Sequence, residues 1–411
     1  MSNNTTTVGI LEKGLADGSV IKTDMARKLT IGGITKTFPV YKVRLDMLYY
    51  NDQNDRIATW ISQYRTEHNG QEPDMGDLEA YNHIIEQFII ASNREDIVKT
   101  RDNISQVDQR EPAVVLYDGR IIDGNRRFTC LRSLAQENDK FNYLETIILD
   151  RSEGSNIKQI KMLELSIQHG EEGKIDYNPV DLLVGLYHDI VETKLLSVAE
   201  YARSTNEKPG AVQKSINIAK LMVEYLEFIN APKQFHIVRD LQLLFPLEEL
   251  AKMLKKCQSN DEAEDLKVCV FTNILMRTSS DLGRFVRKIK NVKASPFYEE
   301  YISEQLEIAE EVLEKLPESG KVTSEALRET VKSNIDLTQK LEKSIDKALT
   351  KVRRSESQSR PVDILENVNS LLTTITVDMF DDFTPEDFPP VEEQLIRMKA
   401  YIEKIQEYIG E

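Results

Sequence analysis

The residues of this sequence best suited to chemistry are the run Asp123-Gly124-Asn125-Arg126-Arg127. It follows an apolar strand pattern over 113–117, the turn dipeptide Asp118-Gly119 and a returning strand over 120–122, and it leads into helical spacing from Phe128. Glycine lets a backbone approach a ligand closely, and free amides at the start of a helix carry partial positive charge. Two adjacent arginines add forked donors that suit phosphate oxygens. The run therefore predicts an anion or nucleotide-phosphate site, although a turn with two solvated arginines is the alternative.

The segments around this run support the phosphate site by resemblance. Ile122–Phe128 resembles the Gly-Glu-Arg-Arg box of ParB-like proteins, in which a strand enters the box and a helix leaves it. Four further segments follow the order of that family's motifs: 43–56, 111–115, 165–169 and 177–179. The resemblance covers about 38–230 and implies a bacterial protein with a ParB/sulfiredoxin fold. It also implies a nucleotide cofactor, CTP or ATP with Mg²⁺, bound by Gly124, Asn125, Arg126, Arg127, Arg56, Gln168 and His169.

The sequence departs from the family pattern in two of these boxes. Asn125 replaces the glutamate of the arginine box, and only Gln168 is kept in the segment that resembles Glu-Asn-Leu-Gln-Arg. Glu164, the acid that could hold the metal, stands one position early and so points about 100° away around a helix. These departures leave the choice of nucleotide open.

A second motif resembles a helix-turn-helix. Residues 195–202 have the pattern of its first helix, 206–209 that of the turn and 210–216 that of the recognition helix. Ala199, Ala202, Val212 and Ile216 are expected to form its apolar core, with base edges read by Gln213, Lys214 and Asn217 and phosphates bound by Lys208 and Lys220. An ordinary helical hairpin is the alternative. The motif follows Asn178-Pro179, the predicted start of a helix, as it does in ParB-like proteins.

The periodicity predicts an α+β, ParB/sulfiredoxin-like N-terminal domain followed by mainly α-helical domains. The expected division is a flexible arm over 1–37, the α+β domain over 38–156, a helical segment with the helix-turn-helix over 157–232, a helical domain over 233–296 and an acidic helical or coiled-coil region over 297–411. A short coiled-coil seam is expected within 324–352, from apolar residues such as Val331, Ile335 and Val352, and a break over 355–361.

The charge is unevenly distributed along the chain. Of the net charge of −16, residues 301–411 contribute −10, with 24 acids against 14 bases, and 361–396 holds nine acids and no base. By contrast, 277–293 holds six bases against one acid, Asp281, which makes it a second possible contact with nucleic-acid backbone or simply a solvated face.

Composition narrows the classes of protein that need considering. The three cysteines are scattered, which favours a reducing, cytoplasmic environment and does not support a disulfide framework. The five histidines have no metal-ligand spacing, so a His-based metal centre has little support. No apolar run approaches the length of a membrane helix, so no membrane partner is expected.

Three functions remain open from the sequence. The leading hypothesis is a nucleotide-binding protein that binds double-stranded DNA, in partition, a mobile element or phage defence. It would form a homodimer through its C-terminal helices, with a possible protein partner on the acidic region. The second is an enzyme of the same fold (NTP hydrolase, kinase or DNA nuclease), with Asp123 as base or metal ligand. The third is a helical adaptor protein.

Overall fold

The computed structural model describes residues 9–31, 33–150, 156–170, 178–277, 281–319 and 322–410, without the side chains of 169, 170, 358 and 359. The chain forms two compact units, Met1–Ile345 and Asp346–Glu411. The first holds the sheet and most of the helices, and the long helix α17 (Ile335–Leu372) begins in it and continues into the second.

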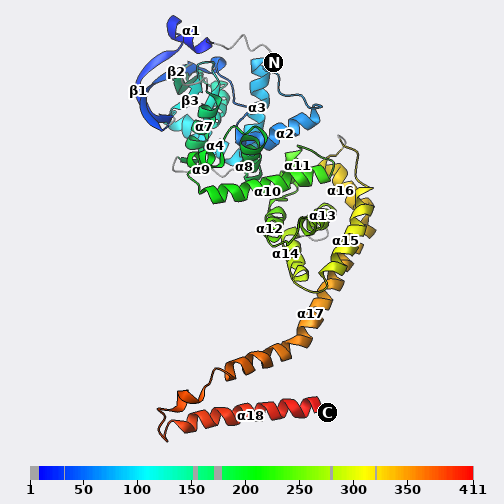
Figure 1. Ribbon diagram of the computed structural model, residues 1–411. Helices are drawn as coiled ribbons and strands as arrows, with labels where there is room; N and C mark the ends of the chain where they lie inside the picture. Colours follow the sequence, from blue (N-terminus) through cyan, green and yellow to red (C-terminus); the bar gives the residue numbers. More distant parts are fainter. Residues whose placement is uncertain are drawn as a thin grey trace. The chain divides into compact units, whose positions relative to one another are not determined.

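The first unit is built on a five-stranded mixed sheet with the order β1-β2-β5-β3-β4 (Figure 1). Strands β1 (Ile21–Ile31) and β2 (Ile34–Arg44) form an antiparallel hairpin, and β5 (Tyr143–Leu149) lies antiparallel to β2. Strand β3 (Ala113–Leu116) is parallel to β5 and antiparallel to the short strand β4 (Ile121–Asp123). The β3–β4 hairpin turns at Gly119, whose φ of +93° favours glycine, and a Cβ there would lie 2.3 Å from the carbonyl oxygen of Met47.

Alternate residues of the strands supply two apolar layers, one on each face of the sheet. On one face, Val114 and Leu116 pack with Ile160 and Leu163 of α7 (Ile157–Gly170). On the other face, Val115 belongs to a larger core with apolar residues of α2 (Ala58–Glu67), α3 (Leu78–Ser92), α4 (Arg94–Val107) and α5 (Asn125–Ala135). The sheet therefore lies between α7 and a layer of helices.

The rest of the first unit is helical. The segment α8 (Pro179–Leu186) begins at Asn178, whose Oδ1 accepts a hydrogen bond from Val180 N as predicted, and it continues into the π-helical segment η4 (Tyr187–Glu192). The following helices are α9 (Val198–Ser204), α10 (Pro209–Phe228), α11 (Phe235–Asp240), α12 (Leu244–Leu254), α13 (Asn260–Met276), α14 (Leu282–Lys293), α15 (Tyr298–Leu313) and α16 (Ser324–Ser333).

The second unit consists of the C-terminal part of α17, the short turn η5 (Val377–Phe380) and α18 (Phe388–Gly410). No side chain of α18 is buried within the described residues. Its apolar residues Leu395, Ile402 and Ile409, spaced seven apart, are all about half exposed or more, at 53%, 47% and 74%. This spacing places one apolar stripe along the helix.

The α+β part followed by helices agrees with the predicted layout, while the five domain boundaries remain predictions. Some details differ from expectation. The segment 1–37, expected to be a flexible arm, contains helix α1 (Ile10–Asp17) and strand β1, because β1 completes the sheet edge beside β2. Helix α17 continues through the expected break at 355–361. Of the expected seam, Ile345, Leu349 and Val352 are buried, whereas Ile335 is 63% exposed. Among the described helices, none has the length and apolarity of a membrane span.

Candidate functional site

The predicted phosphate-binding run lies where the sequence placed it, between β4 and the start of α5. Gly124 precedes the helix with φ of +108°, and a Cβ there would lie 2.7 Å from the Cβ of Ala113. The intrahelical bonds begin with Phe128 N donating to Gly124 O, so the N–H groups of residues 125–127 precede the helix's own hydrogen-bond ladder. A positive-φ glycine before amides that lie outside the helix's own hydrogen-bond ladder is the geometry that suits an anion.

Asn125 is the unusual residue of this run. Its side chain is 8% exposed, and neither its Nδ2 nor its Oδ1 has a hydrogen-bond partner among the described residues. An amide left without partners inside a protein costs about 1–3 kcal/mol. Such a group at a helix start is a reason to look for a ligand that pairs with it.

The two arginines of the run have different surroundings. Arg127 donates from Nη2 to Asp123 Oδ2 at 2.7 Å and from Nη1 to the carbonyl oxygen of Pro112 at 3.1 Å, so it ties α5 to the start of β3. Arg126 lies 3.5 Å from Asp96 Oδ2 of α4. The carboxylate of Asp123, the tentative catalytic acid, is thus occupied by Arg127, and it also lies 3.9 Å from Arg27.

A cavity of about 800 Å³ lies beside this run. Its walls come from the 51–55 loop, from Arg120 and Ile122 of the β3–β4 hairpin, and from α7, α8 and η4. Ile122 is two residues before Gly124, but residues 124–127 do not line the cavity. The volume falls in the range of about 300–1,000 Å³ that is usual for small-molecule sites.

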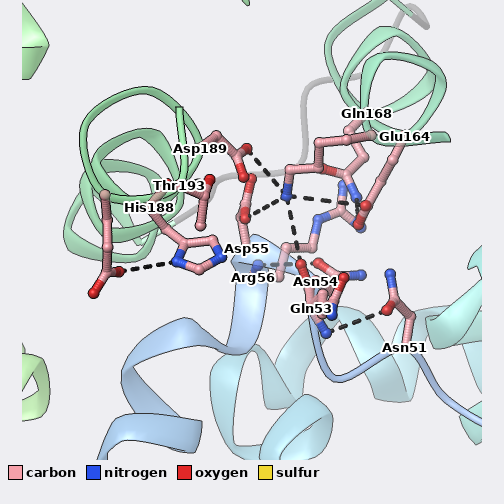
Figure 2. A network of polar contacts seen from close by, with 12 residues as sticks. Asn51, Gln53, Asn54, Asp55, Arg56, Glu164, Gln168, His188, Asp189 and Thr193 are labelled. Carbon is pink, nitrogen blue, oxygen red and sulfur yellow. Dashed lines mark hydrogen bonds and ion pairs between the residues drawn. The ribbon is translucent and has the colours of Figure 1, made fainter. Parts of the chain in front are cut away.

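Lys161 of α7 is the centre of the polar wall of this cavity. Its ammonium lies 2.7 Å from Asp55 Oδ1, 3.4 Å from Asp189 Oδ2 and 4.0 Å from Glu164 Oε2. Figure 2 shows that the three carboxylates come from different elements: the segment η2 (Asp55–Ile57), α7 and η4. Lys161 and all three acids are buried. One lysine thus faces three buried acids.

This imbalance of charge changes the proton affinities of Lys161, Glu164 and Asp189. Burial raises the pKa of Glu164 to about 7 and that of Asp189 to about 6, against the lowering effect of Lys161. Burial by itself lowers the pKa of Lys161, but the charges of Asp55, Glu164 and Asp189 outweigh it and raise that pKa. Lys161 therefore stays charged, while burial makes Glu164 and Asp189 harder to ionise than a carboxyl in water.

Contacts within η2 and of α8 with η2 and α2 hold these groups in place. Asn54 Oδ1 accepts from Arg56 N and so caps η2. A Cβ at Gly185 would lie 2.2 Å from Asp55 Cγ, so glycine is required where α8 passes η2. Asp181 of α8 accepts from Thr59 N at 2.7 Å and caps the start of α2, while burial raises its pKa to about 7. These contacts fix α8 against the sheet-bearing part of the unit.

The structure places the sequence-predicted site residues in two groups. Glu164 lines the cavity and accepts from Gln168 Nε2 at 3.1 Å, and Arg56 lies next to Asp55 in η2. Residues 124–127 form the second group at the start of α5. The side chain of His169 lies outside the described residues. Within the described residues, no group of three or more His, Cys, Asp or Glu could hold a metal ion, so Mg²⁺ binding by Glu164 remains a prediction.

Sequence reasoning missed four residues of the cavity wall: Lys161, Asp55, Asp189 and Arg120. The Nε of Arg120 is buried and has no hydrogen-bond partner among the described residues. For Lys161 and Asp55, the signal that could have been used is weak, because an isolated lysine or aspartate usually indicates a solvated position.

The predicted helix-turn-helix is a pair of helices, α9 and α10, joined by the four residues 205–208. Ser197 and Glu200 form a reciprocal capping box at the start of α9, and Asn206 in the turn has φ of +55°. Ala202, Val212 and Ile216 are buried as predicted, but Ala199 is exposed, and the unpredicted Tyr201 of α9 is buried. The predicted DNA-contacting residues are all exposed: Lys208, Gln213, Lys214, Asn217 and Lys220.

Comparison with known proteins gives no further identification. The sequence matches no protein-family profile and no curated protein.

Proposed function

We propose that this chain binds double-stranded DNA through α9 and α10, in the manner of the ParB-like proteins that its sequence resembles. The observation that carries this proposal is the sorting of α10 into two sides. Val212 and Ile216 are buried, whereas the five residues assigned to DNA are exposed after a short turn with a left-handed asparagine. A helix that follows such a turn and has a free polar face is the element that enters the major groove in helix-turn-helix proteins.

The side chains on this face suit the chemistry of a base-pair edge. Gln213 Nε2 donates to Asn217 Oδ1 at 3.2 Å, so the two amides hold each other one helical turn apart. Side-chain amides pair with the N6 and N7 atoms of adenine, and lysines at both ends of the face suit phosphates. Gln213 and Asn217 are therefore the proposed specificity residues, and Lys208 and Lys220 the phosphate contacts.

The proposal is tested by selecting preferred duplexes with the full chain and measuring binding of single variants. Gln213→Ala and Asn217→Ala should each cost about 1–3 kcal/mol on the selected site and relax its sequence preference. The matched control replaces two exposed amides of the α+β part, Gln71 and Asn103, by alanine. Sequence preference that is unchanged in all four variants would remove α10 as the reading helix.

A second proposed function is nucleotide binding by the α+β part, favoured by the unpaired amide of Asn125. We propose that the phosphates of CTP or ATP, with Mg²⁺, bind at the start of α5 and that the rest of the nucleotide lies toward the neighbouring cavity. Asn125 and the amides of residues 125–127 would donate to phosphate oxygens, with the Arg126 guanidinium as a further donor.

Asn125→Ala separates this role from a purely structural one. Removal of an unpaired buried amide should leave the ligand-free protein as stable as the wild type or more stable. If Asn125 binds phosphate, the same variant should lose the rise in melting temperature that CTP or ATP with Mg²⁺ produces in the wild type. A nucleotide response that is equal in the two proteins would exclude this position as the site.

A further inference from the structure

The helix pair α12 and α14 presents a basic surface on an acidic chain. Phe285, Val286 and Ile289 of α14 are buried, and Arg284, Arg287 and Lys288 are exposed on its opposite side. Lys290 of α14 and Lys255 and Lys256, just beyond the end of α12, are also exposed. We call these six residues the α12–α14 basic surface. It stands out against a net charge of −16.

Most of these cations have no acid beside them. Arg284 lies 3.6 Å from Asp281, and Lys293, outside the surface, pairs with Glu262. In the described part of the chain, no ion pair reaches Lys255, Lys256, Arg287, Lys288 or Lys290. Exposed lysines and arginines on a folded protein often pair with nearby acids, as Lys252 does with Glu249. Five unpaired cations together make a positive potential that attracts an anionic partner.

The surface is also locally organised by an aromatic ring. Phe245 of α12 packs against Gly283 of α14, where a Cβ would lie 2.1 Å from the ring. The Arg287 guanidinium lies over this ring, 5.4 Å from its centre, and the ring is 44% exposed. A guanidinium held by a ring rather than by a carboxylate keeps its N–H donors available for a phosphate.

We propose that the α12–α14 basic surface binds the sugar–phosphate backbone of double-stranded DNA as a second, sequence-independent contact. This inference rests on the proposed DNA binding by α10. Helix α12 packs on α10 and α14 packs on α12, so the surface and the reading helix belong to one packed unit (Figure 1). A duplex carries one negative charge per about 1.7 Å of its axis. Such an extended row of charges matches cations spread over two helices better than a compact acidic ligand would.

The test is the salt dependence of DNA binding by the full chain. One variant replaces Lys255, Lys256, Arg287 and Lys288 by glutamine. The control variant makes the same change in net charge at four exposed cations of the α+β part, Lys22, Lys28, Arg94 and Arg110. Fluorescence anisotropy gives Kd for a selected and a scrambled duplex at salt concentrations from 50 to about 300 mM, where each lost phosphate contact lowers the slope of log K against log salt by about 0.9.

The surface variant should lower this slope by about 3 to 4 and weaken binding equally on both duplexes, while the control changes it little. If the surface variant and the control have the same slope, the proposal is overturned. If, in that case, the surface variant also has a different oligomeric state from the wild type, the surface instead binds the acidic 361–396 segment of a second copy. If Gln213→Ala leaves sequence preference unchanged but the surface variant still lowers the slope, the reading role of α10 fails and this proposal stands.

Discussion

Replacing Lys161 by methionine removes an ammonium that lies within 4.0 Å of the buried carboxylates of Asp55, Glu164 and Asp189. Methionine keeps much of the length of the lysine side chain, so the substitution mainly removes the positive charge. At an effective dielectric constant of about 20, one such pair at 4 Å contributes about 4 kcal/mol of attraction, most of which offsets the cost of burial. Loss of one partner from a buried pair costs about 3–5 kcal/mol. We expect the free energy of unfolding of Lys161→Met at pH 8 to be lower than that of the wild type by about 3–5 kcal/mol, out of a total of about 5–15 kcal/mol that is usual for a folded protein.

The loss should depend on pH in a defined direction. The pKa of Glu164 is raised from 4.5 to about 7 in the folded protein, so the folded state holds this proton at pH values where the unfolded chain has released it. A group with a raised carboxyl pKa stabilises the fold at low pH, and that contribution is lost as pH rises through the folded pKa. Removal of Lys161 raises the carboxyl pKa values further. Lys161→Met should therefore be much less destabilising at pH 5 than at pH 8.

Urea unfolding at the two pH values measures both effects, with fluorescence of Trp60 as the signal. Trp60 is the single tryptophan of the chain, lies in α2, and has the Arg239 guanidinium 3.8 Å from its ring centre. The matched control is Glu164→Gln, which removes one of the three acids and should be neutral or stabilising at pH 8. A loss below about 1 kcal/mol for Lys161→Met at pH 8, or an equal loss at both pH values, would refute the electrostatic reasoning.

The remaining predictions concern the arginine pair, the acidic segment and assembly. Arg127→Ala should lower the free energy of unfolding by about 1.5–3 kcal/mol in urea, because its bonds to Asp123 and the Pro112 carbonyl are lost, whereas Arg126→Ala should spare stability and abolish the nucleotide-induced thermal shift. Changing Asp378, Asp381, Asp382 and Glu386, all exposed, to their amides should tighten DNA binding at low salt in fluorescence anisotropy, and an unchanged Kd would remove the acidic segment as a modulator. Light scattering of the full chain should give a mass of twice 47.2 kDa, because the exposed heptad stripe of α18 needs a partner helix. Ile402→Glu should give the monomer, and a single 47.2 kDa species in the wild type would contradict the dimer.

The features that the sequence predicted well are those with short-range signals. The turn dipeptide Asp118-Gly119 between two apolar runs is a hairpin signal within ten residues, and β3 and β4 form there. Asn178-Pro179 is a helix-start signal within two residues, and α8 begins at Pro179. In both cases the backbone conformation is decided by the residues that carry the signal.

The groups that the sequence did not predict depend on contacts between distant segments. Asp55 and Lys161 are 106 residues apart, and Asp181 and Thr59 are 122 residues apart. Hydrophobic periodicity predicted helical structure from 157 onward, but it could not show that Lys161 faces inward, because a lysine on a helix usually extends into solvent. The contacts of Arg127 to Asp123 and to the carbonyl of Pro112 were not predicted either, and its role as a phosphate ligand stays a prediction.

Helix α7 connects the cavity with the proposed DNA-binding helices. Its apolar side packs on the sheet through Ile160 and Leu163, and Lys161 joins it to η2 and η4. At its N-terminal end, Lys158 lies 2.7 Å from Glu200, the same carboxylate that closes the capping box of α9. A shift of α7 relative to the sheet must therefore disturb buried charges at one contact and the start of α9 at another. Because separating one partner from a buried ion pair is costly, this network is suited to hold α9 and α10 in one position relative to the cavity.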